Sequence, residues 1–329
     1  MDDLVNVGLV GCGGMGLGLA DAVRDSGRGR MVGFCDEIEE RSKQPAQEHG
    51  GRAYGSIDEM LGEKDLDAVM IAAPQFFREE PTEAAARAGK HVYVEKPMAL
   101  SVAGCDRMIH TCREAGVTLM VGQVLRYYEP FRSILRWSRE GRFGRPLHAC
   151  IQRVCQGSFE ASSWRCYLSK SGGCLFELGI HELDFMRCLL GRPRRVFALR
   201  QKARQAEHEL EDTMSMLVQF ESGASGHYDS GMAWGKDKYE LILCFEEATL
   251  VSPSAFDTSA LKAVPAAGEG EIKLDGYETE RALTRQMRDW LESLRDGRPV
   301  PTSGEEGREA VRLAEAAYRS AQTAEVQRL

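Results

Sequence analysis

The feature that most constrains the fold is a glycine-rich turn close to the amino terminus. Residues 4–10 form an apolar run of strand length, and residues 17–25 follow with helical periodicity. The turn between them has the spacing G-x-G-x-x-G, in which the first glycine allows a tight bend and the second lets the backbone approach a pyrophosphate. The third glycine lets the helix pack closely on the strand. We therefore predict a strand, turn and helix that bind a dinucleotide. The residues of this turn are Gly11, Cys12, Gly13, Gly14, Met15 and Gly16.

An acidic residue stands where such a site needs one. Asp36 ends the second apolar run, residues 31–35, at the usual distance of about 20 residues from the last glycine of the turn. A carboxylate there accepts hydrogen bonds from both ribose hydroxyls and repels a 2′-phosphate, and Glu37 adds negative charge. The sequence predicts NAD as the cofactor. Arg41 can reach back toward the adenosine ribose, so NADP remains the less favoured alternative.

The first 122 residues alternate between strands and helices. The further expected strands are 67–73, 91–94 and 117–121, and the expected helices between them are 79–88 and 102–115. Strands that alternate with helices imply right-handed crossovers and a parallel sheet. We expect an α/β Rossmann domain over residues 1–122.

From residue 123 onward, turns rather than helices separate most of the strands. The expected strands are 147–156, 196–202, 213–220, 224–230 and 239–245. Strands joined in this way pair mainly antiparallel. We expect a second, α+β domain over residues 123–329, built on a mainly antiparallel sheet.

Three helices and one loop complete this second domain. A helix over residues 174–190 interrupts the strands and ends before Gly191 and Pro193. Residues 252–271 are poor in large apolar groups and predict a loop. Residues 278–296 and 304–324 are amphipathic, and we expect these C-terminal helices, within 278–324, to pack back on the first domain.

Composition excludes several classes of protein. The 42 basic and 50 acidic residues give a net charge of -8 and are mixed along the chain, so no nucleic-acid partner is expected. No apolar run approaches the ~20 residues that cross a bilayer. The ten cysteines form no C-x-x-C pairs and no signal-like leader precedes the first strand, which favours a cytoplasmic protein with reduced thiols and no metal site.

Two groups of residues have the chemistry of an active site. Glu95-Lys96-Pro97 follows a strand at the carboxyl edge of the predicted sheet, and Pro97 biases Lys96 toward an extended backbone that can hold its ammonium toward a substrate oxygen. In a helix, Glu177, His181 and Asp184 stand at i, i+4 and i+7 and share one face. A carboxylate one turn away can orient the imidazole. From these residues alone, a structural histidine with a solvated acidic stripe stays open.

Taken together, these motifs resemble the Gfo/Idh/MocA family, named for glucose-fructose oxidoreductase, inositol dehydrogenase and rhizopine catabolism. The resemblance covers nearly the whole chain. It is carried by the glycine turn, the strand end at 72–74, the run 88–97, the Trp164-Arg165 pair before Gly172-Gly173, the run 179–184 and the C-terminal segment 304–318.

The resemblance implies a Rossmann domain and a second domain whose open sheet forms dimer or tetramer contacts. It implies Lys96 and His181 as the catalytic pair, with His181 as general base and Lys96 polarising the reacting oxygen. Ala73, Pro74 and Glu95 would line the nicotinamide ribose, and Trp164 and Arg165 would approach the cofactor or substrate. The full set of expected cofactor-binding residues also includes Lys96 and Gln123.

The chain departs from the family at two places. Glu177 stands where the family often has Asp, and it reaches one methylene further. Gln75 and Arg78 stand where the family often has Asn and His, which puts the cofactor contacts of that loop in doubt. Substrate specificity is the least transferable property, because one fold serves many chemistries.

The sequence therefore predicts an NAD-dependent oxidoreductase that moves a hydride between nicotinamide and a secondary hydroxyl of a sugar or polyol, with C3 of a pyranose as the candidate position. The alternative is a redox glycoside hydrolase, which oxidises, eliminates, adds water and reduces in one turnover. A cofactor-binding regulator without catalysis is the least favoured reading. Candidate substrate contacts or proton donors are Tyr127, Tyr128, Tyr167, Asp184 and His227.

Overall fold

The computed structural model describes residues 4–156, 159–160, 162–202, 208–232 and 234–329. It divides into two compact units. The first unit comprises Met1–Val124 and Glu280–Arg308, and the second comprises Leu125–Thr279 and Glu309–Leu329. The chain thus crosses between the units three times, the last time within its final long helix.

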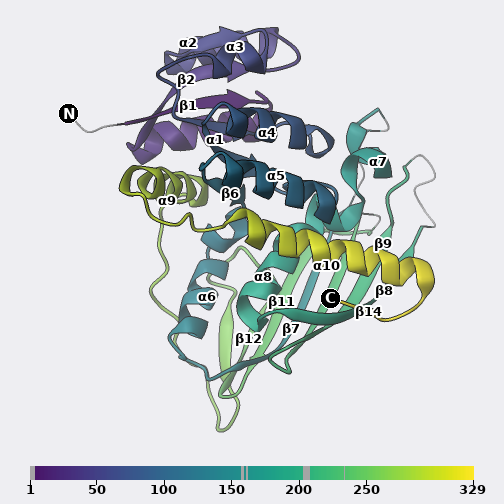
Figure 1. Ribbon diagram of the computed structural model, residues 1–329. Helices are drawn as coiled ribbons and strands as arrows, with labels where there is room; N and C mark the ends of the chain where they lie inside the picture. Colours follow the sequence, from purple (N-terminus) through teal and green to yellow (C-terminus); the bar gives the residue numbers. More distant parts are fainter. Residues whose placement is uncertain (1–3, 157–158, 161, 203–207, 233) are drawn as a thin grey trace. The chain divides into compact units, whose positions relative to one another are not determined.

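The first unit contains a six-stranded parallel sheet with the order β3-β2-β1-β4-β5-β6. Figure 1 labels its strands β1, β2 and β6 together with helices α1 to α5 of the same unit. Its strands are β1 (Val5–Val10), β2 (Gly29–Cys35), β3 (Arg52–Tyr54), β4 (Ala68–Ile71), β5 (His91–Glu95) and β6 (Leu119–Gly122). This order confirms the predicted Rossmann fold. The edge strand β3 was not predicted, because three residues with one buried side chain are too short to show a pattern.

Helices connect these strands. They are α1 (Gly14–Ser26), α2 (Glu40–His49), α3 (Ile57–Leu61), the 3-10 helix η1 (Gln75–Phe77), α4 (Glu79–Arg87) and α5 (Val102–Glu114). Serine residues begin two of them: the Ser56 hydroxyl accepts from the Glu59 amide, and the Ser101 hydroxyl accepts from the Gly104 amide. Such caps satisfy amide groups that the first helical turn leaves unpaired.

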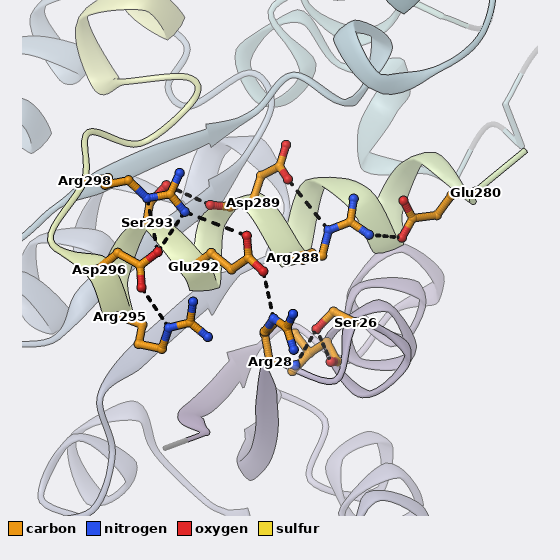
Figure 2. Close-up of polar contacts among 11 residues, drawn as sticks. Ser26, Arg28, Glu280, Arg288, Asp289, Glu292, Ser293, Arg295, Asp296 and Arg298 are labelled. Atoms are coloured by element: carbon orange, nitrogen blue, oxygen red, sulfur yellow. Dashed lines mark hydrogen bonds and ion pairs between the residues drawn. The ribbon is translucent and has the colours of Figure 1, made fainter. Parts of the chain in front are cut away.

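Helix α9 (Ala282–Asp296) belongs to the first unit although it lies far along the chain. Its buried side chains include Trp290, whose ring lies 5.4 Å from that of Tyr93. Ion pairs follow its outer side, among them Arg28 with Glu292 at 2.7 Å (Figure 2). These charges are partly exposed, and exposed pairs contribute little to stability. Burial of the apolar face therefore holds α9 in place.

The second unit contains an eight-stranded sheet with the order β13-β12-β11-β7-β10-β9-β8-β14. Its strands are β7 (Pro146–Val154), β8 (Pro193–Gln201), β9 (Thr213–Phe220), β10 (Ser225–Gly231), β11 (Lys238–Phe245), β12 (Ala248–Ser252), β13 (Lys262–Pro265) and β14 (Gln327–Arg328). The pairing is antiparallel except between β7 and β10, which confirms a mainly antiparallel sheet. The loop expected over 252–271 is wrong in part, since it contains β13.

The helices of this unit are η2 (Val124–Tyr127), α6 (Phe131–Arg139), η3 (Trp164–Cys166), α7 (Leu168–Ser171), η4 (Leu175–Gly179), α8 (Ile180–Leu190) and most of α10 (Gly304–Thr323). The single helix predicted over 174–190 needs correction, because η4 is a π-helix and only α8 is α-helical. None of the helices in the described ranges of the chain has the length and apolar character needed to cross a membrane.

The sheet of the second unit has two different faces. Helix α8 packs on β7 and β10, and the inward side chains of these strands are buried. Side chains of the opposite face alternate with them along each strand, as pleated strands require. Several large apolar groups on this opposite face are exposed: Leu199, Leu217, Ile242 and Val264.

Candidate active site

The glycine turn of the first unit has the geometry that its spacing predicts. Gly11 has a φ of 93°, and a Cβ there would lie 2.7 Å from the backbone of Ala73. A Cβ on Gly16 would lie 2.0 Å from the Gly11 carbonyl oxygen, so the start of α1 fits only with glycine. By contrast, a Cβ on Gly13 or Gly14 would meet no atom within 4 Å. One side of the turn is closed by backbone, and the other is open.

Helix α1 begins at this open side. Gly13 stands at its N-cap and provides no side chain to accept from the first amides. These amides and the positive end of the helix dipole favour a phosphate oxygen. The turn therefore fits the pyrophosphate of a dinucleotide by its own geometry, as well as by its sequence.

Asp36 lies beside the turn. Its Oδ2 accepts from the Cys12 amide at 2.8 Å, and its Oδ1 accepts from the Ile38 amide at 2.9 Å. Each carboxylate oxygen has a second lone pair for a ribose hydroxyl. Burial, together with the negative charge of Asp36, raises the pKa of Cys12 to about 12, so this thiol is neutral. Arg41 is exposed in the first turn of α2.

The carboxyl ends of β4 and β5 are joined by one arginine. Arg78 is only 7% exposed, and its guanidinium donates to the carbonyls of Ala73 (2.8 Å), Glu95 (2.9 Å) and Pro97 (2.6 Å). The sequence showed Arg78 only as a departure from the family pattern. Its partners are backbone atoms that no pattern of side chains reveals.

The two residues of the Glu95-Lys96 pair differ in exposure. Lys96 is half-buried, whereas Glu95 is 2% exposed and points into the first unit. The Tyr93 hydroxyl and the Lys96 amide donate to its carboxylate at 3.0 and 3.1 Å. Burial raises the pKa of Glu95, although the positive charges of Arg78 and Lys96 oppose this shift. The carboxylate of Glu95 thus supports the Lys96 segment from inside.

Other expected cofactor residues of this unit lie at the same strand ends. Ala73 is buried and Pro74 is half-buried after β4. Gln123 follows β6 and is 1% exposed. Its Oε1 has no hydrogen-bond partner among the described residues, so a buried polar atom remains to be satisfied there.

In the second unit, His181 is the second residue of α8, which directly follows the π-helix η4, and it is 9% exposed. Isolated π-helical turns are rare in proteins, and those that occur often lie at functional sites. This turn also changes the spacing that sequence analysis assumed for Glu177 and His181, because a π-helix has a wider turn. The α-helical geometry assumed for this turn is thus corrected, and the role of Glu177 toward His181 stays a prediction.

Glu177 contacts an arginine. Its Oε1 lies 2.7 Å from Nε of Arg165, and the Arg165 guanidinium lies 4.5 Å from the Trp164 ring centroid. Trp164 and Arg165 thus lie at Glu177 in the same unit. The acid that was expected to orient His181 forms an ion pair with one of the residues expected at the cofactor.

Two buried carboxylates follow His181 closely in sequence. Glu182 is fully buried; its Oε1 lies 3.0 Å from Arg153 and accepts from the Tyr239 hydroxyl, while its Oε2 accepts from Tyr228. Burial, and next the charge of Glu182, raise the pKa values of Tyr228 and Tyr239, so both hydroxyls stay protonated donors.

Asp184 is the second of these carboxylates. It is 1% exposed and forms a two-bond ion pair with Arg126, at 2.6 Å to Nε and 2.7 Å to Nη2. The expected role of Asp184 as a substrate contact is therefore corrected. Its lone pairs are directed to arginine inside the second unit.

The remaining candidates occupy different environments. Tyr127 is buried, whereas Tyr128 and Tyr167 are exposed, and the Tyr128 ring packs on Phe256 at 5.3 Å. His227 lies between Cys150 and Asp229, with its ring nitrogens 3.4 Å from the sulfur and 3.3 Å from the carboxylate. Because its neighbour Tyr228 faces α8, His227 faces the opposite side of the sheet. His227 is thus wrong as a donor beside His181.

No group of three or more His, Cys, Asp and Glu side chains within the described ranges is arranged to hold a metal ion. The candidate functional groups of the two units are the glycine turn with Asp36, Lys96 and His181. Such groups serve nucleotide binding and proton transfer.

Comparison with known proteins shows the family of this chain. Residues 5–123 match the oxidoreductase family with an NAD-binding Rossmann fold, and residues 139–327 match the C-terminal alpha/beta domain of the same family. The chain belongs to the Gfo/Idh/MocA family. This confirms the resemblance deduced from its motifs and makes it an NAD-binding member of a family of sugar oxidoreductases.

The chain is also similar to several named proteins that act on sugars or sugar derivatives. A 2,7-anhydro-N-acetylneuraminate hydratase of Escherichia coli K12 is 30% identical over 286 residues, which cover 85% of this chain and 70% of that protein. A 1,5-anhydro-D-fructose reductase of Ensifer adhaerens is 29% identical over 270 residues, covering 79% and 81%. The structure of the WlbA dehydrogenase from Bordetella pertussis with NADH and UDP-GlcNAcA has a TM-score of 0.86 at 25% identity and covers 99% of each chain.

Proposed function

We propose that this protein is an NAD-dependent dehydrogenase that oxidises a secondary hydroxyl of a sugar or polyol, with C3 of a pyranose as the target. One observation carries the proposal. Lys96 and His181, the expected catalytic pair, both lie on segments held by buried polar contacts: Arg78 and Glu95 for Lys96, and Glu182 and Asp184 for His181. Such support is what a catalytic group needs in order to keep its geometry.

Each residue of the pair has a defined task in this proposal. Bound nicotinamide supplies the hydride acceptor. The His181 imidazole takes the hydroxyl proton of the substrate, while the Lys96 ammonium donates a hydrogen bond to the same oxygen and stabilises the charge that develops there. Trp164 and Arg165 are proposed to meet the cofactor or substrate, and Tyr127, Tyr128 and Tyr167 to contact the sugar.

We further propose NAD rather than NADP as the physiological cofactor. Asp36 is fixed by two backbone amides beside the glycine turn, where a 2′-phosphate would meet its negative charge. Ala73, Pro74 and Gln123 are proposed to contact the nicotinamide half. Arg41 is exposed nearby in sequence and is the residue that would weaken the preference.

A second function has a specific observation in its favour. The 30% identical relative is named a hydratase of an anhydro sugar, which is not a net oxidation. A redox glycosidase would oxidise the sugar at C3, remove the acidified proton from C2, release the leaving group from C1, add water and return the hydride within one turnover. The same Lys96 and His181 would open both reactions.

The exposed sheet face supports a proposal about assembly. Leu199, Leu217, Ile242 and Val264 place large apolar side chains on one face of four different strands. Exposed apolar patches of this kind mark protein contacts. We propose that two or four copies associate through this face. Ten free cysteines agree with the reducing cytoplasm as the location.

One incubation tests the main proposal against its rival. The purified protein is mixed with NAD and a panel of free sugars, polyols, and α- and β-glycosides, and NADH absorbance and product mass are followed. A keto-sugar that accumulates with NADH supports the dehydrogenase. Release of aglycone without net NADH identifies the glycosidase, and bound cofactor without any turnover would favour a regulator.

A further inference from the structure

One buried side chain of the first unit holds the backbone on both sides of Lys96. Arg78 stands at the start of α4, and its Nη1 donates to the carbonyls of Glu95 and Pro97, which directly precede and follow Lys96. Its Nε donates to Ala73, which follows the neighbouring strand β4. A single guanidinium therefore connects the ends of β4 and β5. It also holds the backbone on both sides of Lys96.

The chemistry of arginine suits this position. Three carbonyl oxygens at the ends of parallel strands have no further strand to pair with, and a buried acceptor that lacks a donor is costly. The guanidinium is planar and presents its donors in a rigid fork, so it fixes the directions of several acceptors at once. A lysine ammonium is a point charge on a flexible stem and does not fix them in the same way.

The charged groups near the Arg78 guanidinium also hold the Lys96 segment. Glu95 is buried, its carboxylate accepts from the Lys96 amide, and the positive charges of Arg78 and Lys96 both act on it. The Arg78 contacts fix the main chain of the segment, while the Glu95 contact fixes the amide of Lys96 itself. The side chain of Lys96 thus leaves a backbone that is held at three neighbouring residues.

We infer that Arg78 is the positioning residue of Lys96: it sets the direction of the lysine ammonium toward the reacting oxygen without touching substrate. The inference rests on the proposed function of Lys96 and deepens it. It assigns a task to a residue that the sequence marked only as unusual.

The test compares Arg78→Met and Arg78→Lys with Arg87→Met. Arg87 is an exposed arginine of the same helix, paired with Glu83, and serves as the matched control. Because a displacement of ~1 Å at a catalytic group costs about 100-fold in rate, kcat should fall by roughly that factor in both Arg78 variants. The Kd for NADH should change far less, and Arg87→Met should match the wild type. Free guanidinium added to Arg78→Ala should restore part of kcat.

A readout that needs no substrate separates this inference from the proposed function. Lysines are reductively methylated with a 13C label, and the Lys96 signal is identified by its loss in Lys96→Arg. In the wild type the signal should be distinct, and in Arg78→Met and Arg78→Lys it should move to the position of exposed lysines. If no sugar is turned over but this movement is seen, the proposed function fails and the positioning role stands.

Three results would overturn the inference. One is an unchanged Lys96 signal in folded Arg78→Met. Another is a kcat of wild-type size in either Arg78 variant, with thermal unfolding confirming that the variant is folded. The third is a loss of NADH affinity as large as the loss of kcat, which would make Arg78 a cofactor-site residue instead.

Discussion

Lys96 in the first unit and His181 in the second are supported by different kinds of contact. Around Lys96, a charged side chain donates to neutral backbone carbonyls, and the nearby carboxylate of Glu95 accepts from an amide and a phenol. After His181, the carboxylates of Glu182 and Asp184 form ion pairs with arginines. Backbone-directed contacts suit a loop at a strand end, whereas ion pairs between side chains suit a helix that packs on a sheet.

This difference has energetic consequences. A buried ion pair that loses one partner leaves an uncompensated charge, which is strongly destabilising. A lost donor to carbonyls leaves neutral acceptors, which water can reach more cheaply at the edge of a sheet. Substitutions in the ion pairs of the second unit should therefore mainly lower the free energy of unfolding. Substitutions around Lys96 should mainly displace its side chain.

The largest expected effect tests whether both regions serve one reaction. His181→Ala and Lys96→Ala should each lower kcat by about 10²–10⁴-fold, since a positioned acid or base contributes that much, while NADH binding is retained. Steady-state kinetics on the substrate found by the panel, with quantitation of bound cofactor, measures this. Wild-type rates in both variants would remove the proposed pair.

The next effect concerns the ion pairs of the second unit. Arg153→Met leaves the buried charge of Glu182 without its cationic partner and should cost about 3–5 kcal/mol in the free energy of unfolding. Thermal or denaturant unfolding measures the loss, and Arg145→Met, which breaks an exposed pair with Glu246, is the control that should change little.

A double variant sharpens this result. Arg153→Met with Glu182→Gln removes both charges but keeps an acceptor for the Tyr228 and Tyr239 hydroxyls, so it should recover much of the stability. If the single variant is as stable as the control, the ion pair does not hold α8.

A smaller effect is expected at Glu177. Since its carboxylate pairs with the partly exposed Arg165, Glu177→Gln should lower kcat by less than about tenfold and leave the pH profile of kcat in place. A profile whose midpoint shifts on this substitution would show that Glu177 acts on His181 directly. Glu177→Asp serves as the comparison that keeps the charge.

The smallest effect is a pH dependence of stability from Glu95. Burial raises its pKa above the ordinary value of 4.5, so the folded state favours the protonated acid. The stability from this group is fully present below about pH 4.5 and is lost as pH rises through the higher folded pKa. The difference in Tm between Glu95→Gln and the wild type should therefore grow in favour of Glu95→Gln from pH 4.5 toward neutrality. A difference that stays constant over this range would contradict the raised pKa.

The Rossmann half was predictable from sequence because its signals are local. The glycine turn, the acidic residue after β2 and the alternation of apolar runs with amphipathic stretches each report on a few consecutive residues. The short elements β3 and β13 were missed because three or four residues do not establish a period. The π-helix was missed because its side chains follow the same apolar pattern as an α-helix over so short a length.

The sequence by itself determined the family, the nucleotide turn, the NAD-binding character and the identity of Lys96 and His181 as candidates. These follow from residue types at fixed spacings, which the chain carries without reference to distant parts. Only the tertiary structure decided the contacts of these residues. Arg78 donates to three carbonyls, Glu177 pairs with Arg165, and Asp184 pairs with Arg126. His227 lies on the sheet face opposite to α8. Each of these contacts joins groups separated along the chain, or depends on which way a strand or helical turn faces, and that is set by packing rather than by local sequence.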